Sequence, residues 1–227
     1  MLTLEQIIDR LADVFGEPPA EPSRSVLELV LLENVAYLVD DEQRWRAFRA
    51  LEATVGTRPE QILAASDDAL TTVAGHGILA AHQADKLRQI ARITIDEFGG
   101  SLESIRSLPL REAKKALMRF PSIGEPGAEK ILLQARSHAV LGLDSNGVRV
   151  LTRLGVVKEA KSYGATYRAV PAAVQPYHSR GFDWLIRSEH LLRQHGQELC
   201  RRTKPLCDRC PLSDVCAYYR RGLTTNG

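Results

Sequence analysis

The chain of 227 residues lacks several features that would assign it to a broad class. It has no apolar run near the roughly 20 residues needed to cross a bilayer, and no recognisable signal segment at its start. It also has no internal repeat, no low-complexity tract and few aromatic residues, 6% in all. These absences disfavour a membrane, secreted or repeat protein. They predict a globular protein in the reducing cytoplasm, with no membrane partner.

Cysteine is scarce, and its placement is informative. The only four cysteines are Cys200, Cys207, Cys210 and Cys216, in the pattern C-x6-C-x2-C-x5-C. Disulfides are disfavoured in a reducing compartment. Structural zinc usually has two separate C-x-x-C or similar pairs, whereas this chain has one. Thiolates select zinc or iron–sulfur centres, and the spacing favours a [4Fe–4S] cluster held by all four cysteines.

Charge is unevenly distributed along the chain. The net charge is only +2, but residues 1–68 carry six basic and fourteen acidic side chains, whereas the remaining residues carry 24 basic and 14 acidic ones. Within 193–221, seven basic residues face three acidic ones. A basic C-terminal part on a nearly neutral chain indicates either a surface that meets a polyanion or an ordinary solvated face.

Apolar periodicity is helical almost throughout. Residues 84–98 place one apolar face at helical spacing and end at Gly99-Gly100. We also expect helices at 3–15, 41–54 and 183–195, and one at 25–39 that is apolar nearly all round and hence buried. Pro18, Pro19 and Pro22 indicate a linker. With no convincing alternating strand, the predicted fold class is all-α.

Two motifs lie in the centre of the chain. Residues 112–136 read as a helix, a tight P-S-I-G turn and a second helix, and we expect Gly124 to adopt a backbone conformation closed to other residues. Free N–H groups at such a turn can bind an anion, although an ordinary helical hairpin has the same pattern. Further on, Asp144 precedes S-N-G-V-R, where it is expected to cap a helix.

Together these motifs resemble the helix-hairpin-helix DNA glycosylases of the endonuclease III superfamily. The hairpin F-P-S-I-G-E-P-G-A is similar to the family's L-P-G-V-G-x-x-T-A, and Asp144 follows it at the distance of the family's catalytic aspartate. His195-Gly196 followed by the four cysteines resembles the family's cluster loop, and Gln83–Leu87 the helix before the hairpin. The resemblance covers roughly residues 25–217.

The resemblance implies two helical domains flanking a DNA-binding cleft. Residues 25–137 would form a six-helix barrel containing the hairpin 112–136. Residues 1–24 and 138–227 would form the iron–sulfur domain, with its cluster loop at 200–216. Double-stranded DNA containing a lesion or mismatch would be the partner, with one nucleotide flipped out of the helix. The expected DNA contacts are Ser122, Ile123, Gly124, Gly127, Arg149, Arg201, Arg202, Lys204 and Arg209.

Two residues depart from the family pattern. Pro126 stands at the position matching the lysine that attacks the sugar in the lyase-active members, which would close that route. Glu125 beside it would repel a phosphate.

Asp144-Ser145-Asn146 is closer to the D-G-N or D-A-N of adenine and mismatch-thymine glycosylases than to the D-T-H of the lyases. Glu33, Asn34 and Asn146 are the candidates for the base pocket or wedge.

The sequence thus predicts a monomeric, nucleoid-associated, monofunctional DNA glycosylase of base excision repair, in which Asp144 assists water attack. Uracil or thymine opposite guanine is the favoured substrate, and an alkylated purine is second. Two alternatives stay open. One is a catalytically silent protein that binds DNA damage or structure, and the other is a lyase using Lys130 or Lys161. Tyr163, Tyr167 and Tyr177 could stack on a base, but packing is their commoner role.

Overall fold

The computed structural model describes residues 2–19, 22–37, 39–75 and 79–224. Every regular element within these ranges is helical, and no strand occurs in them, which confirms the predicted all-α class. In the same ranges, no helix combines the length and the apolarity that crossing a membrane requires.

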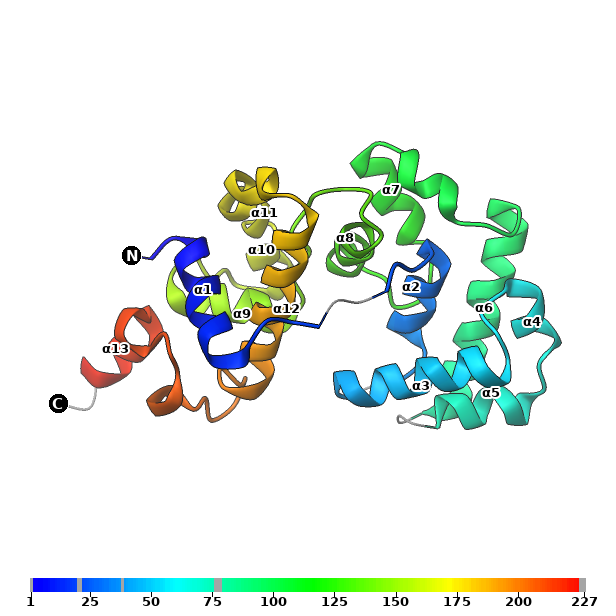
Figure 1. Cartoon of the computed structure of the whole chain (residues 1–227), viewed down its shortest axis with the longest axis horizontal. Coiled ribbons are helices and arrows are strands. Elements are labelled where there is room, and N and C mark those ends of the chain that lie inside the picture. The colour runs from blue at the N-terminus through cyan, green and yellow to red at the C-terminus, as the bar shows by residue number, and fades with distance from the viewer. Residues whose placement is uncertain (1, 20–21, 38, 76–78, 225–227) are drawn as a thin grey trace. The chain divides into compact units, whose positions relative to one another are not determined.

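The α-helices follow one another along the chain (Figure 1). In chain order they are α1 (Leu4–Phe15), α2 (Val26–Asn34), α3 (Asp41–Thr54), α4 (Pro59–Ala64), α5 (Asp67–Ala74), α6 (Ala80–Phe98), α7 (Leu110–Leu117), α8 (Glu125–Gln134), α9 (Ser145–Leu154), α10 (Tyr163–Tyr167), α11 (Val170–Val174), α12 (Phe182–Glu198) and α13 (Ala217–Thr224). Short 3₁₀ helices occur at η1 (Glu103–Ser107), η2 (Gln175–Arg180), η3 (Cys207–Arg209) and η4 (Ser213–Val215).

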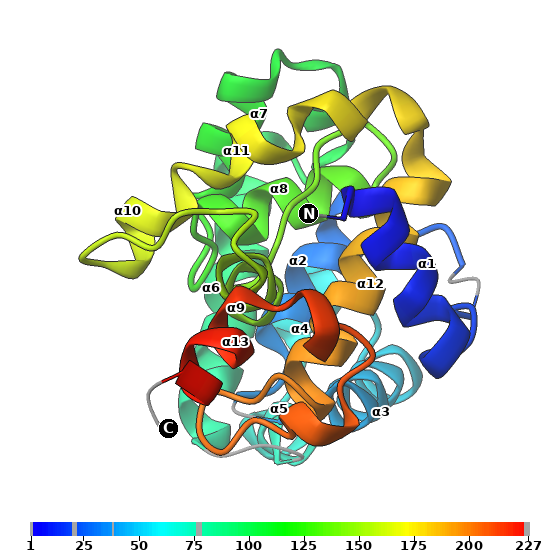
Figure 2. The ribbon, with the colours of Figure 1, turned by 90° about the vertical axis from the view of Figure 1, so that its left-hand side faces the viewer.

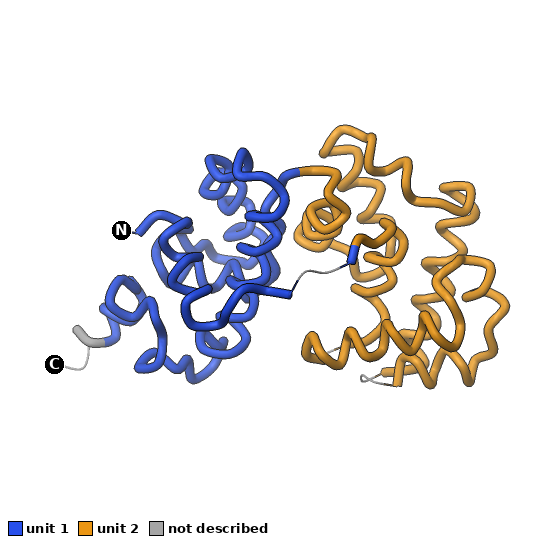
Figure 3. The backbone as a smooth tube through the Cα atoms, viewed as in Figure 1, with its two compact units in different colours: residues 1–22, 139–227 blue, residues 23–138 orange. Residues whose placement is uncertain are grey.

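The chain divides into two compact units (Figure 3). Unit 1 comprises Met1–Pro22 and Ala139–Gly227, and unit 2 comprises Ser23–His138. The first unit is therefore built from both ends of the chain, and the second is one continuous segment. The helical hairpin lies in unit 2, whereas Asp144 and all four cysteines lie in unit 1.

Helix ends follow from capping residues. Thr3 with Gln6 and Ser25 with Glu28 form reciprocal capping boxes that satisfy free N–H groups at the starts of α1 and α2. At the end of α6, Gly99 has φ +65°, a left-handed conformation in which glycine avoids the Cβ clash. The predicted end of this helix at Gly99-Gly100 is thereby confirmed.

The helix predicted at 25–39 is shorter in the structure. Helix α2 ends at Asn34, whose side-chain Nδ2 donates to the Val30 carbonyl oxygen one turn earlier at 3.1 Å. Residues 35–37 are not helical, and residue 38 lies outside the described residues. Asp40 then caps α3. The burial of α2 nearly all round is confirmed, because seven of its nine residues are buried.

Each unit has its own apolar interior. In unit 2, one continuous cluster runs from Val26 to Ala135 and joins α2 to the hairpin and to α6. In unit 1, α12 packs against both α1 and α9 (Figures 1 and 2). Leu4, Ile7, Ile8 and Leu11 of α1 are buried there. Removing such a side chain from water stabilises the fold by about 1.5–3 kcal/mol. Helix α12 therefore holds α9, and with it Asp144, in place.

Candidate functional site

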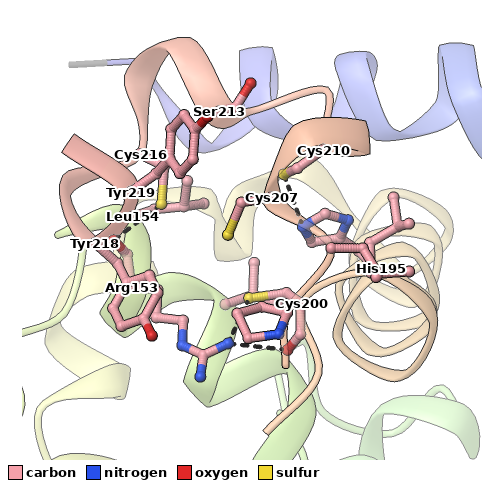
Figure 4. A pocket seen from close by; sticks show the side chains of 14 residues that line it. Arg153, Leu154, His195, Cys200, Cys207, Cys210, Ser213, Cys216, Tyr218 and Tyr219 are labelled. Atoms are coloured by element: carbon pink, nitrogen blue, oxygen red, sulfur yellow. Dashed lines mark hydrogen bonds between the residues drawn. The ribbon is translucent and has the colours of Figure 1, made fainter. Parts of the chain in front are cut away.

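All four cysteines face one small cavity in unit 1 (Figure 4). Cys200 follows α12, Cys207 begins η3, Cys210 follows η3, and Cys216 precedes α13. All four are free thiols. Apolar side chains from α9 and the loop, including Val150, Leu154 and Leu206, complete the lining. The loop thus brings four thiols to one largely apolar cavity.

The thiols interact electrostatically. Burial and the neighbouring thiols raise the pKa of Cys210 to about 11, and burial also raises the pKa of Cys207. Without a cation, the Cys210 and Cys207 thiols are therefore protonated at neutral pH. A bound metal centre would displace their protons. Among the described residues, no group of three or more His, Cys, Asp or Glu side chains is arranged to hold a single metal ion.

Two further side chains border the thiols. His195 Nε2 lies 3.6 Å from Cys210 Sγ, and burial lowers the pKa of His195 to about 4, which keeps the imidazole neutral. Arg153 Nη1 donates to Cys200 Sγ at 3.4 Å and to the Arg201 carbonyl oxygen at 2.7 Å. Arg153 therefore ties α9 to the start of the cysteine loop, a role that no motif in the sequence indicated.

Asp144 caps α9, as predicted. Its Oδ1 accepts from the backbone N–H groups of Asn146 at 2.8 Å and Gly147 at 2.9 Å, and its Oδ2 accepts from Asn146 Nδ2 at 2.8 Å. Arg193 of α12 lies 3.6 Å from Oδ2. The carboxylate is thus fixed in orientation and compensated by a cation, while 23% of the side chain stays exposed. It is a rigid anion accessible to a ligand.

The Arg149 guanidinium donates hydrogen bonds to other residues of unit 1. Its Nε donates to the Cys200 carbonyl oxygen at 2.8 Å, and its Nη2 donates to Asn146 Oδ1 and to the Gly196 carbonyl oxygen, both at 2.7 Å. The side chain therefore joins the Asp144 turn to α12 and the cysteine loop. Burial lowers the pKa of Arg149. Its predicted DNA contact stays a prediction.

The close approach of α12 to α9 requires glycine at position 196. A Cβ at this position would lie 2.7 Å from the Cβ of Asn146 and 2.9 Å from its carbonyl oxygen. Helix α12 therefore approaches the start of α9 so closely that no side chain fits between them. The His195-Gly196 pair serves both sites, since one residue borders the thiols and the next admits the Asp144 turn.

The hairpin forms as predicted, with α7 and α8 packed together through buried Leu117, Phe120 and Ile131. The prediction for Gly124 is wrong. Its φ of −95° and ψ of −175° are extended values that any residue adopts. The left-handed residue of the turn is Ser122, with φ +60°, and Lys86 of α6 donates to its hydroxyl oxygen at 2.8 Å.

The hairpin amides are only partly free. Ile123, one of the predicted DNA contacts, donates its N–H to the Phe120 carbonyl oxygen at 3.3 Å, within the turn. Ser122 and Gly124 are exposed, and Gly127 is half-buried in the first turn of α8. The first N–H groups of a helix have no partner within that helix, so the start of α8 still presents donors.

Glu125 has a partner that the sequence did not indicate. Lys114 of α7 reaches across the hairpin to Glu125 at 2.5 Å and to Glu129 at 2.7 Å. Burial lowers the pKa of Lys114, but the two hydrogen bonds outweigh it and the net shift is upward. The ammonium group therefore offsets the carboxylate that was expected to repel a phosphate.

The lyase candidate Lys130 and the wedge candidates of α2 are all held by other residues of unit 2. Pro126 occupies the second position of α8. Lys130, one turn later, is 8% exposed and its Nζ lies 2.7 Å from Glu33 Oε1. Glu33 also pairs with Arg44 at 3.4 Å. Asn34 is 1% exposed. Both wedge candidates of α2 are thus engaged within unit 2.

The basic residues of the cysteine loop are on the surface. Arg201, Arg202, Lys204 and Arg209 are all exposed. Arg201 Nε donates to the Glu198 carbonyl oxygen at 2.9 Å, and Lys204 has φ +52°. The loop therefore presents a cluster of cations to solvent.

Comparison with known proteins agrees with the motifs, although no protein-family model matches the chain. Endonuclease III of Rickettsia conorii is 25% identical over 221 residues, which span 94% of this chain and 97% of that protein. Thymine-DNA glycosylase of Aeropyrum pernix is 30% identical over 107 residues, 47% of this chain and 48% of that protein.

A solved structure extends the similarity to the fold. Endonuclease III trapped as a covalent intermediate with DNA matches 98% of this chain with a TM-score of 0.74, at 20% identity over all of that chain. The chain is therefore similar to endonuclease III along its length in sequence and in fold, which confirms the resemblance to the helix-hairpin-helix DNA glycosylases that its motifs indicate.

Proposed function

We propose that the chain is a monofunctional DNA glycosylase of base excision repair. The observation that carries the proposal is Asp144, a rigid, partly exposed carboxylate at the start of α9, held by two backbone N–H groups and facing Arg193. A fixed anion of this kind suits a reaction whose transition state carries positive charge on a sugar.

The reaction would break the bond between the sugar C1′ and the base nitrogen. The base leaves with the electron pair and takes up a proton, so that an oxocarbenium-like sugar develops. Asp144 stabilises that cation and orients or deprotonates the attacking water, whose oxygen forms the new bond to C1′. The products are the free base and an abasic site. A positioned group of this kind contributes about 10²–10⁴-fold to the rate.

Two lysines bear on the lyase alternative. A lyase would need an amine nucleophile, which Pro126 cannot supply. Lys130 is paired with Glu33 and nearly buried, which disfavours it as the substitute. Lys161 is exposed, and trapping on abasic DNA with borohydride tests it directly. We therefore favour hydrolysis over lyase chemistry.

The proposed substrate is uracil or thymine opposite guanine in duplex DNA, with an alkylated purine as the second candidate. The turn Asp144-Ser145-Asn146 supports this choice, because it is closer to the D-G-N or D-A-N of the adenine and mismatch-thymine glycosylases than to the D-T-H of the lyases. The relative from Aeropyrum pernix is named a thymine-DNA glycosylase.

The four thiols fit a [4Fe–4S] cluster in number and type. A single tetrahedral zinc ion, with Zn–S bonds of about 2.3 Å, would draw four thiolates closely together. A cluster takes one thiolate at each of four irons and so accepts a wider arrangement. Cys200, Cys207, Cys210 and Cys216 would hold it. The bound group would supply iron–thiolate bonds that fix the loop and its exposed cations for contact with DNA phosphates.

The test is a single-turnover excision panel. Duplexes would carry uracil or thymine opposite guanine, adenine opposite 8-oxoguanine, an oxidised pyrimidine or an alkylated purine, each assayed with and without alkali. We expect strand cleavage at one of the first two only after alkali. Breaks without alkali would establish a lyase. Binding to DNA with no excision across the panel would favour the silent binder instead.

Asp144→Asn gives the first prediction. Asparagine caps helices nearly as well as aspartate, so α9 should persist and DNA affinity should change little. Excision should fall about 10²–10⁴-fold, because the anion is gone. Asp183→Asn in α12 is the matched control, since it removes an exposed carboxylate from the same unit. Full excision by Asp144→Asn would refute the assignment.

A further inference from the structure

Unit 1 has a second and larger cavity, which the proposed chemistry does not use. It is an open groove of about 550 Å³ lined by α9, the segment 159–166, the cysteine loop and α13. Figure 2 shows α9, α10 and α13, the three helices that contribute to it. Sites for small organic ligands span about 300–1,000 Å³, so a nucleotide-sized group has room here.

The groove is strongly basic. Its lining includes Arg149, Arg153, Lys161, Arg202 and Arg221 against one carboxylate, that of Glu159. Arg149 and Arg153 are committed to the protein's own carbonyl oxygens. Lys161 and Arg202 are exposed, and neither side chain has a partner in the described part of the chain. Two cations are therefore available to a ligand.

An exposed aromatic ring lies beside these cations. Of the three tyrosines considered from sequence, Tyr167 is buried and Tyr177 stacks on Trp184, so both serve packing. Tyr163 lines the groove and is 48% exposed. An exposed ring next to unpaired cations is the combination that binds a base and its phosphate.

The groove begins next to Asp144. Ser145, the first residue of α9, lines it, and its side chain is exposed. Partial burial of the ring and, second, the Asp144 carboxylate raise the pKa of Tyr163 to about 12, so the ring lies within electrostatic reach of that carboxylate. A DNA strand whose sugar is placed at Asp144 would therefore have an adjacent nucleotide near Tyr163.

We propose that this groove binds a nucleotide adjacent to the target in the DNA strand, with its base stacked on Tyr163 and its phosphate between Lys161 and Arg202. The proposal rests on the proposed function, since it requires DNA at Asp144. To the contacts of the hairpin and the cysteine loop it adds the ring of Tyr163 and the cation of Lys161. It also predicts that affinity depends on an unstacked base beside the lesion.

The first experiment measures affinity of the full chain for a lesion-containing duplex against salt concentration. Each phosphate contact contributes about 0.9 to the slope of log K against log salt. Lys161→Ala with Arg202→Ala should lower the slope by about 0.9, because the two cations hold one phosphate. Lys158→Ala, which removes an exposed charge just before the segment 159–166 and outside the groove, should leave the slope unchanged within error. Tyr163→Ala should weaken binding roughly 5-fold or more, and Tyr163→Phe should not.

A second experiment places the ring on the DNA. 5-Iodouracil, a photo-crosslinker of stacked aromatic rings, is substituted at each of three positions on either side of the lesion, and crosslinked peptides are mapped by mass spectrometry. We expect one substituted position to crosslink to Tyr163. Circular dichroism of each variant checks that the exposed substitutions leave the fold intact.

The outcomes separate the two proposals. If the wild-type chain binds and excises, but the groove variants match Lys158→Ala and no position crosslinks to Tyr163, the groove proposal fails and the glycosylase proposal stands. If the wild-type chain does not bind DNA at all, both fail. A lower slope together with a Tyr163 crosslink supports the groove.

Discussion

At the scale of single residues, Asp144 and Tyr163 affect each other through charge. The phenol of Tyr163 has its pKa raised to about 12, by burial and then by the Asp144 carboxylate, against an ordinary value near 10. We predict that the ultraviolet difference spectrum of wild type minus Tyr163→Phe shows only a small phenolate fraction at pH 11. In Asp144→Asn, the same phenol should ionise at lower pH.

The sign of the linked stability change follows. Between about pH 10 and 12 the unfolded chain has already lost the Tyr163 proton that the folded chain retains, so the folded state loses stability as pH rises through this window. Tyr163→Phe should lack this contribution. A phenolate signal near pH 10 that is unchanged in Asp144→Asn would show that the two groups do not interact.

At the same scale, the sequence indicated some site residues and not others. Asp144 was predictable as a cap, because capping depends on the residues that follow it directly. Arg193 and Arg153 were not, since they reach Asp144 and Cys200 from positions about 50 residues away along the chain. Only the packing of α9 against α12 brings those groups together.

At the scale of elements, the contact of α12 with α9 depends on Gly196. We predict that Gly196→Ala lowers the free energy of unfolding by about 1–3 kcal/mol, the usual cost of overpacking, because its Cβ would lie 2.9 Å from a backbone oxygen of Asn146. Excision should fall with it, since the Asp144 turn must move. Chemical denaturation and the excision assay measure the two effects.

Gly124→Ala is the matched control. A Cβ there would lie 3.8 Å from Pro126 Cδ, an ordinary contact, and the extended backbone suits alanine. Its free energy of unfolding should fall by less than about 1 kcal/mol, the cost of replacing the N-cap glycine of α8 with alanine. Equal losses from the two alanines would mean that close approach at Gly196 is not the cause.

The hairpin gives a second prediction for elements. Lys114→Ala removes the cation that faces Glu125 and Glu129, and Glu129 is 5% exposed. We expect a loss of about 1–3 kcal/mol in the free energy of unfolding and weaker DNA binding, because Glu125 then faces the phosphate uncompensated. Lys115→Ala, which removes the next and exposed lysine, is the control. Denaturation and salt-dependent binding distinguish them.

Helices of strong periodicity were predictable, whereas the short ones were not. The helix at 84–98 appears within α6 because its apolar face repeats over several turns. Helices α10 and α11 have five residues each, too few to show a period, and depend on packing in unit 1. The left-handed residue of the hairpin turn was also not predictable. Glycine is the usual residue there, which favoured Gly124, whereas the structure has Ser122 in that conformation.

At the scale of the whole molecule, the two units should respond differently to loss of the thiol site. The apolar cluster of unit 2 runs from Val26 to Ala135 and includes no residue of unit 1. Unit 1 contains the cavity with all four thiols, which borders α9 and α12. If a cluster cross-links these elements, its loss should destabilise unit 1 and leave the interior of unit 2 unchanged.

Cys210→Ala tests this by hydrogen exchange and metal analysis. The wild-type chain should contain four irons and four sulfides per molecule, the composition of the proposed cluster, and the variant should lose them. Amides of 145–216 should exchange at least about 10-fold faster, equivalent to about 1.4 kcal/mol, with those of 26–135 unchanged. Ser213→Ala, which lines the same cavity without a thiol, should match wild type. Uniformly faster exchange in 26–135 and 145–216 would show that the two units unfold together. Loss of iron without faster exchange would show that the thiols bind the cluster but that the stability of unit 1 does not depend on it.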